Sequence, residues 1–268
     1  MSRYRSHLLF VGAFAMAACG GLGTARDASV EDAPQDAAST RDADVEDDAE
    51  SDGPPDVDCS EGLVWEGDYY LREPAHISRI SRYTRITGEL NIGGGVLENV
   101  NGLECLREVG GYLWIAEALR LADLSGLRSL SSVGGGVVLS HNAALRTLDG
   151  LESLSTIGRD LTVSYNERLE SLSSLTSLAA VNGELIIEFN ESLGDLAGLT
   201  SLSFVAGTLR LSTNPSLAGV EGLSALHSVA GELRIQSNWR LTSLGGLRSL
   251  LAVGGDVFIW DNRSLVSL

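Results

Sequence analysis

Apolar and polar positions repeat along most of this chain with a period of 24 residues. One unit can be written L-x-[IVL]-x-x-N-x-x-L-x-x-L-x-G-L-x-x-L-x-x-V-x-G-x. Its asparagine stands at Asn142, Asn166, Asn190, Asn214, Asn238 and Asn262. So regular a register predicts a solenoid in which each unit is one coil, and a coil this small needs its neighbours to cover its apolar side chains.

Each unit begins with three alternating positions, as in Leu161, Thr162 and Val163. Alternation predicts a short β-strand whose first and third side chains point inward. The leucines after the asparagine recur every three residues, a spacing that suits short extended or 3₁₀ segments better than a sheet or an α-helix. We expect the asparagine amide to point inward, to satisfy backbone groups at a turn and to bond the amides of adjacent coils.

Residues 78–92 resemble the opening of a receptor L-domain, and units such as 185–193 are similar to its leucine-rich coils. The resemblance covers about residues 59–268. It implies an all-β solenoid, a right-handed β-helix of 24-residue leucine-rich coils. Such domains occur in growth-factor-receptor ectodomains, fungal wall proteins and bacterial surface lipoproteins. The resemblance implies a fold and carries over no binding residue.

Both ends of the repeat depart from the pattern. The first coil has Gly93-Gly94-Gly95 in place of the asparagine, and the second has Ala118, as is typical of capping repeats. The sequence stops at Leu268, partway through a coil. Either the gene is truncated or another molecule covers that end, and the second alternative predicts self-association there.

The first 18 residues have the pattern of a signal peptide, with Arg3 and Arg5 before a short apolar run. The run ends in Met-Ala-Ala-Cys-Gly, which resembles a bacterial lipobox and implies that Cys19 carries a lipid. The residue after the cysteine, Gly20, favours the outer membrane or cell surface. The alternative is ordinary cleavage by signal peptidase after a small-x-small motif.

Charge separates the next segment from the repeats. The whole chain has a formal charge of −17, and residues 20–58 hold 13 acidic residues against two arginines. We expect residues 19–58 to form a disordered acidic tether, with a cation-binding tail as the alternative. The acidic balance excludes nucleic acid as a natural partner.

A cap is expected over residues 59–85, before the solenoid at 86–268. Cys105 stands in a column otherwise filled mainly by serine, and Cys59 precedes the first coil. We predict a disulfide between them, worth about 4 kcal/mol in the chain-entropy model; two free buried thiols are the alternative. Pro74, followed by apolar residues at helical spacing, predicts a short helix.

No catalytic motif stands out. The four histidines have no partner at metal-ligand spacing, and the acidic residues are spread by repeat instead of gathered in pairs. One acidic column at the repeat end could form a calcium ladder or a solvated edge. We therefore expect no cofactor, no bound metal and no enzymatic activity.

The outward strand positions predict a binding surface instead. Aromatic and arginine side chains gather in the later coils, a combination typical of hot spots and of sugar binding. The alternative is that the last aromatics cover a missing coil. The candidate binding residues are Arg210, Arg234, Trp239, Phe258 and Trp260.

Three functions remain open from the sequence. The first is a surface-anchored module that recognises an extracellular or envelope protein or a glycan. The second is a structural envelope component that assembles with its own copies. The third is a β-helical polysaccharide-cleaving enzyme, against which the dispersed acidic residues count.

Overall fold

The computed structural model describes residues 58–266. The predicted signal peptide at 1–18, the lipidation site Cys19 and the tether up to residue 57 lie outside these residues, so their predictions stay untested.

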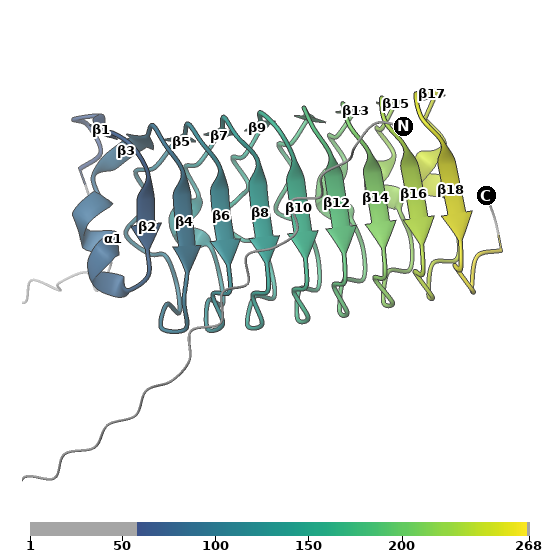
Figure 1. Ribbon diagram of the computed structural model, residues 1–268, viewed down its shortest axis with the longest axis horizontal. Helices are drawn as coiled ribbons and strands as arrows, with labels where there is room; N and C mark the ends of the chain where they lie inside the picture. The colour runs from purple at the N-terminus through teal and green to yellow at the C-terminus, as the bar shows by residue number, and fades with distance from the viewer. Residues whose placement is uncertain (1–57, 267–268) are drawn as a thin grey trace, which may run out of the picture. The chain divides into compact units, whose positions relative to one another are not determined.

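The described residues form an all-β solenoid, which confirms the predicted fold class (Figure 1). Two parallel sheets run along it, and each coil contributes one strand to each sheet. Leu161 lies opposite Leu185, which lies opposite Leu209, so the sheet register is the 24-residue repeat itself. The first sheet consists of β1 (Leu63–Trp65), β3 (Tyr83–Ile86), β5 (Glu108–Val109), β7 (Ser132–Val133), β9 (Thr156–Ile157), β11 (Ala180–Val181), β13 (Phe204–Val205), β15 (Ser228–Val229) and β17 (Ala252–Val253).

The second sheet has longer strands and positions the site described below. Several of its strands, such as 185–188, alternate buried and half-buried residues as the sequence pattern predicts, and in two others a terminal serine, Ser164 or Ser212, is buried as well. It consists of β2 (Tyr69–Leu71), β4 (Leu90–Gly93), β6 (Leu113–Ala116), β8 (Val137–Ser140), β10 (Leu161–Ser164), β12 (Leu185–Glu188), β14 (Leu209–Ser212), β16 (Leu233–Gln236) and β18 (Val257–Trp260).

Leucines between the two sheets fill the core. The three-residue spacing produces short 3₁₀ turns in several coils and tight turns in the others. Their leucines are buried except toward the C-terminal end, where Leu247 and Leu250 are partly buried. The 3₁₀ turns are η1 (Ser125–Leu127), η2 (Ala197–Leu199), η3 (Glu221–Leu223) and η4 (Gly245–Leu247).

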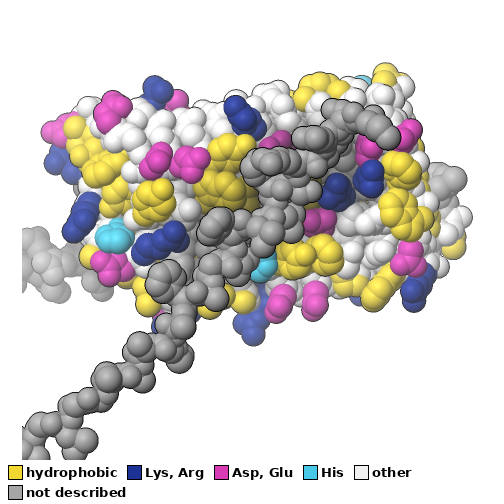
Figure 2. Space-filling view, viewed as in Figure 1, with side chains coloured by type: hydrophobic (Ala, Val, Ile, Leu, Met, Phe, Trp, Pro, Cys, Tyr) yellow, Lys and Arg dark blue, Asp and Glu magenta, His cyan; other side chains and the backbone are white. Residues whose placement is uncertain are grey.

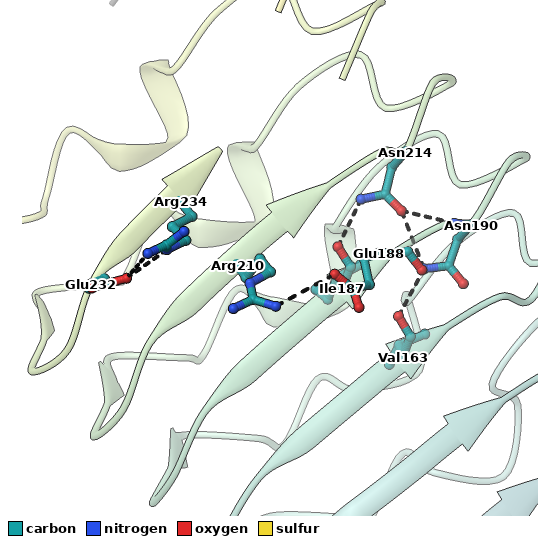
Figure 3. Close-up of polar contacts among 8 residues, drawn as sticks. All are labelled: Val163, Ile187, Glu188, Asn190, Arg210, Asn214, Glu232 and Arg234. Atoms are coloured by element: carbon teal, nitrogen blue, oxygen red, sulfur yellow. Dashed lines mark hydrogen bonds and ion pairs between the residues drawn. The ribbon is translucent and has the colours of Figure 1, made fainter. Parts of the chain in front are cut away.

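The asparagines form a continuous buried ladder. The Asn190 side-chain amide donates to the Val163 carbonyl at 2.9 Å, and that of Asn214 donates to the Ile187 carbonyl at 2.9 Å (Figure 3). The Asn214 side-chain oxygen accepts from both the backbone and the side-chain amide of Asn190. The same contacts recur one coil at a time, so each amide joins three coils, as expected.

The N-terminal end of the solenoid is capped. Helix α1 (Pro74–Ile80) buries Ile77 and Ile80, which confirms the predicted helix. Cys59 and Cys105 form a disulfide, as predicted. Neither α1 nor any other helix within residues 58–266 combines the length and apolarity needed to cross a membrane.

The last described coil is covered less completely. Val257 and Ile259 of β18 are 53% and 36% exposed, whereas the matching Leu233 and Ile235 of β16 are almost fully buried. In the earlier coils the following coil covers these inward positions.

Candidate functional site

A column of left-handed residues follows the strands of the second sheet. In seven successive coils the residue just before the asparagine, or before Ala118, has a positive φ between 52° and 58°. This conformation favours glycine and asparagine and is unusual for bulky side chains. The column consists of Glu117, His141, Tyr165, Phe189, Thr213, Ser237 and Asp261.

Three rings of this column stack on one another. The His141 and Tyr165 rings lie 4.7 Å apart between centroids and 13° from parallel, and the Tyr165 and Phe189 rings lie 4.6 Å and 8° apart. The ring faces within the stack cover one another. The ring edges are therefore accessible along the side of the stack, and one ring face is uncovered at each end. All three side chains are exposed.

A groove of about 440 Å³ runs along this stack. Its other wall is the column just after the asparagine, which includes Glu167, Glu191 and Trp239. The groove lies within the usual size range of ligand sites. Its lining consists of Leu119, His141, Ala143, Tyr165, Glu167, Phe189, Glu191, Thr213, Pro215 and Trp239.

Two carboxylates without ion-pair partners among the described residues line the groove. Glu167 and Glu191 are exposed carboxylates on adjacent coils, and neither side chain has a hydrogen bond or ion pair within residues 58–266. Among the described residues that line the groove, His141 is the only basic one, and none is an arginine. Figure 2 shows a histidine, an apolar cluster and two acidic groups side by side at the carboxyl ends of these strands. Such a wall favours a cationic ligand.

The structure brings four of the five predicted binding residues together on the outer face of the second sheet. Arg210, Arg234 and Phe258 are register neighbours in β14, β16 and β18. The Arg234 guanidinium lies 4.6 Å from the centroid of the Phe258 ring, and this ring contacts Trp260 edge-on at 5.9 Å. The fifth residue, Trp239, lies beyond the end of β16 and lines the groove instead.

Both arginines of that surface already have acidic partners. The Arg234 side chain pairs with Glu232 at 2.5 Å, and Arg210 lies 3.9 Å from the Glu188 carboxylate (Figure 3). Their charges are therefore less available to a ligand than those of unpaired side chains.

Trp239 is held at the end of the groove by its neighbours in the last described coil. The Arg263 guanidinium lies 5.3 Å from the Trp239 ring centroid and also donates to the Asp261 carboxylate at 3.2 Å. Hydrogen bonds from Arg263 and Ser237 lower the pKa of Asp261. One end of the groove is thus an aromatic side chain already covered by a guanidinium.

The acidic column at the repeat end includes Asp160 and Glu184, and Asp160 stabilises the backbone of the next coil. The Asp160 carboxylate accepts a hydrogen bond from the backbone amide of Glu184 at 2.7 Å. Within residues 58–266, no three metal-ligating side chains gather around one point. The calcium-ladder alternative therefore gains no support.

Trp239 was predicted from the sequence, but none of the other residues of the groove was, although their spacing indicates them. His141, Tyr165 and Phe189 follow one another at the 24-residue period, immediately before the asparagines. Their stacking depends on a left-handed turn that the alternating pattern of the strand does not predict.

Comparison of the chain with family models, with curated proteins and with solved structures gives no match. The resemblance to receptor L-domains therefore stays a prediction.

Proposed function

We propose that this protein is a non-catalytic recognition module that binds a protein or glycan along the aromatic groove. The observation that carries the proposal is an exposed stack of three rings beside two carboxylates that have no partner among the described residues. Display at the outer membrane or cell surface through lipidated Cys19 completes the proposal.

Backbone conformation supports the groove as the binding surface. The coil needs a left-handed residue before each asparagine, but it does not need a ring there, since Ser237 occupies the same position. Tyr165 and Phe189 adopt this conformation at a cost of about 1–2 kcal/mol each. Bulky residues that are strained and yet exposed are typical of functional sites.

The predicted surface around Arg210 and Arg234 is less well supported, because Glu188 and Glu232 pair with these arginines. Its contribution can be tested beside that of the groove.

The test compares the wild-type protein with a Tyr165→Ser, Trp239→Ser double variant on a glycan array and against a displayed random-peptide library. Phe204→Ser is the matched control, because Phe204 is 37% exposed and lies outside the groove lining. An Arg210→Ala, Arg234→Ala variant tests the sheet surface. We expect ligands that bind the wild type and the control and are lost from the groove variant. Equal binding by the groove variant, or no ligand in either assay, contradicts the proposal.

One observation favours a second candidate function, an envelope scaffold built by self-association. Val257 and Ile259 are exposed at positions that are buried in earlier coils, and such apolar edges pair readily. Sedimentation velocity over a range of concentrations tests this candidate: a wild-type oligomer that Ile259→Asp dissociates supports it, and a monomer at all concentrations excludes it.

A further inference from the structure

The ring stack ends on an open face. In the coil after Phe189, the same column holds Thr213, whose short side chain also lines the groove. No ring or guanidinium contact from the described residues covers this side of Phe189. A space about one coil thick therefore lies beside the ring, since adjacent strands are about 4.8 Å apart.

Elsewhere in the solenoid, guanidinium groups cover rings in this way. Arg234 lies over Phe258 of the next coil and pairs with Glu232, two residues before it. Arg263 lies over Trp239 of the preceding coil and pairs with Asp261, again two residues away. Each arginine thus has a ring in an adjacent coil and a carboxylate in its own.

Phe189 and Glu191 offer the same two partners, a ring and a carboxylate, without an arginine, although here both come from one coil. Both line the groove, and Glu167 on the preceding coil adds a second carboxylate. We propose that an arginine side chain of a partner polypeptide occupies this place. Its guanidinium stacks on the open face of Phe189, above Thr213, and pairs with Glu191. This inference rests on the proposed function and names the ligand of the same groove.

The groove chemistry favours an arginine-bearing polypeptide over the other ligands considered. A guanidinium is planar, so it matches the space that one more ring would take, whereas an ammonium group is a compact and strongly hydrated charge. A neutral glycan can donate hydroxyl hydrogen bonds to Glu167 and Glu191 but cannot neutralise their charge, whereas a guanidinium does both. The apolar walls at Tyr165, Pro215 and Trp239 suit apolar side chains on either side of the arginine.

The probe is the peptide acetyl-Ala-Leu-Arg-Leu-Ala-amide, titrated into the purified protein while the ring-proton NMR signals of Phe189 and Trp239 are followed. Two matched peptides carry lysine or citrulline in place of arginine. We expect saturable shifts with the arginine peptide and about tenfold weaker binding with citrulline, which keeps the shape and loses the charge. Lysine should lie between the two.

Two variants locate the arginine. Thr213→Phe fills the space with a fourth ring and should weaken binding at least about tenfold; the coil accepts a ring at this position, as Tyr165 and Phe189 show. Glu191→Gln removes the carboxylate without disturbing any partner and should weaken binding similarly. Phe204→Leu and Glu170→Gln, outside the groove lining, are the controls and should bind like the wild type.

Equal affinity for the arginine and citrulline peptides, unchanged binding by Thr213→Phe or Glu191→Gln, or no saturable shift would each overturn this inference. The array and display assays separate its failure from that of the proposed function. A Trp239-dependent ligand without arginine keeps the recognition module and rejects the arginine site, whereas the absence of any such ligand rejects both.

Discussion

Asn190 illustrates how single side chains hold the coils together. Its amide nitrogen donates to Val163 and Glu188, and its oxygen accepts from the backbone of Asn166. Val163 and Glu188 lie in β10 and β12, whereas Asn166 follows β10 at the turn, where its backbone amide has no strand partner. The asparagine thus supplies an acceptor for the Asn166 amide at the turn and ties the turn to the adjacent strand.

Replacing Asn190 by alanine should lower the free energy of unfolding by about 1–3 kcal/mol, because it leaves the Asn166 amide buried without its acceptor and removes the bond to the Val163 carbonyl. Denaturant-induced unfolding measures the change. Asn182→Ala is the control, since Asn182 is exposed and makes a single longer bond to Ile157. A loss no larger than that of the control would refute the ladder as a source of stability.

Thr213 is a strained residue whose side chain makes no hydrogen bond in the described structure. Its φ of 55° is unfavourable for a β-branched side chain, and asparagine tolerates this conformation far better. Thr213→Asn should therefore raise the free energy of unfolding by about 1 kcal/mol. Thermal and denaturant unfolding of the two proteins check this, and a destabilised variant would mean that Thr213 packs favourably where it stands.

At the scale of elements, the spacing of adjacent coils depends on a column of glycines at the 3₁₀ turns. A Cβ on Gly222 would lie 1.8 Å from the Leu196 carbonyl oxygen of the preceding coil, and one on Gly198 or Gly246 would meet the backbone as closely. Ser174 takes this place in one coil, where no 3₁₀ turn forms and its hydroxyl donates to Asp149. Close approach of two backbones is therefore what the glycine provides.

Gly222→Ala should cost about 1–3 kcal/mol or more, because the methyl group forces two coils apart. Gly194→Ala is the matched control: its Cβ would come no nearer than 3.8 Å to the preceding coil, so its effect should be within about 1 kcal/mol of zero. The two free energies of unfolding test the close-packing argument, which fails if both variants behave alike.

At the scale of the whole molecule, each coil pairs only with the coils before and after it. Stability is then a sum over coils and their interfaces, so a complete coil can be removed without changing the contacts of distant ones. The groove depends on the order of coils, because its rings and carboxylates come from successive repeats.

Deleting residues 185–208, one full coil, should leave a folded solenoid, because Leu209 can take the register of Leu185 beside Leu161. The deletion removes Phe189 and Glu191 but brings Tyr165 and Glu167 beside Thr213, so a site for arginine should form again on the Tyr165 ring while the fold remains. Circular dichroism and thermal unfolding report the fold, and the arginine peptide reports the groove.

Deleting only 185–196 is the control for this experiment. It joins half-coils out of register and should abolish cooperative unfolding. A full-coil deletion that behaves as badly would contradict the nearest-neighbour picture.

The sequence by itself determines the solenoid, because every coil repeats one pattern. The residues equivalent to Asn190 or Leu185 therefore have the same surroundings in successive coils. The sequence also determines the cap, since Cys105 departs from its column and Pro74 opens a helical pattern. These features depend on residue spacing along the chain, and the same spacing recurs in every repeat.

Only the tertiary structure decided the site. The sequence could place Trp239 near the binding surface, but not show that Glu188 and Glu232 pair with Arg210 and Arg234. The rings in the groove lie 24 residues apart, and their stacking depends on a left-handed turn and on the distance between coils. The repeat determines the scaffold. The ligand surface consists of side chains from successive coils that stacking brings together, and the residue pattern of one strand does not specify which side chains lie beside it.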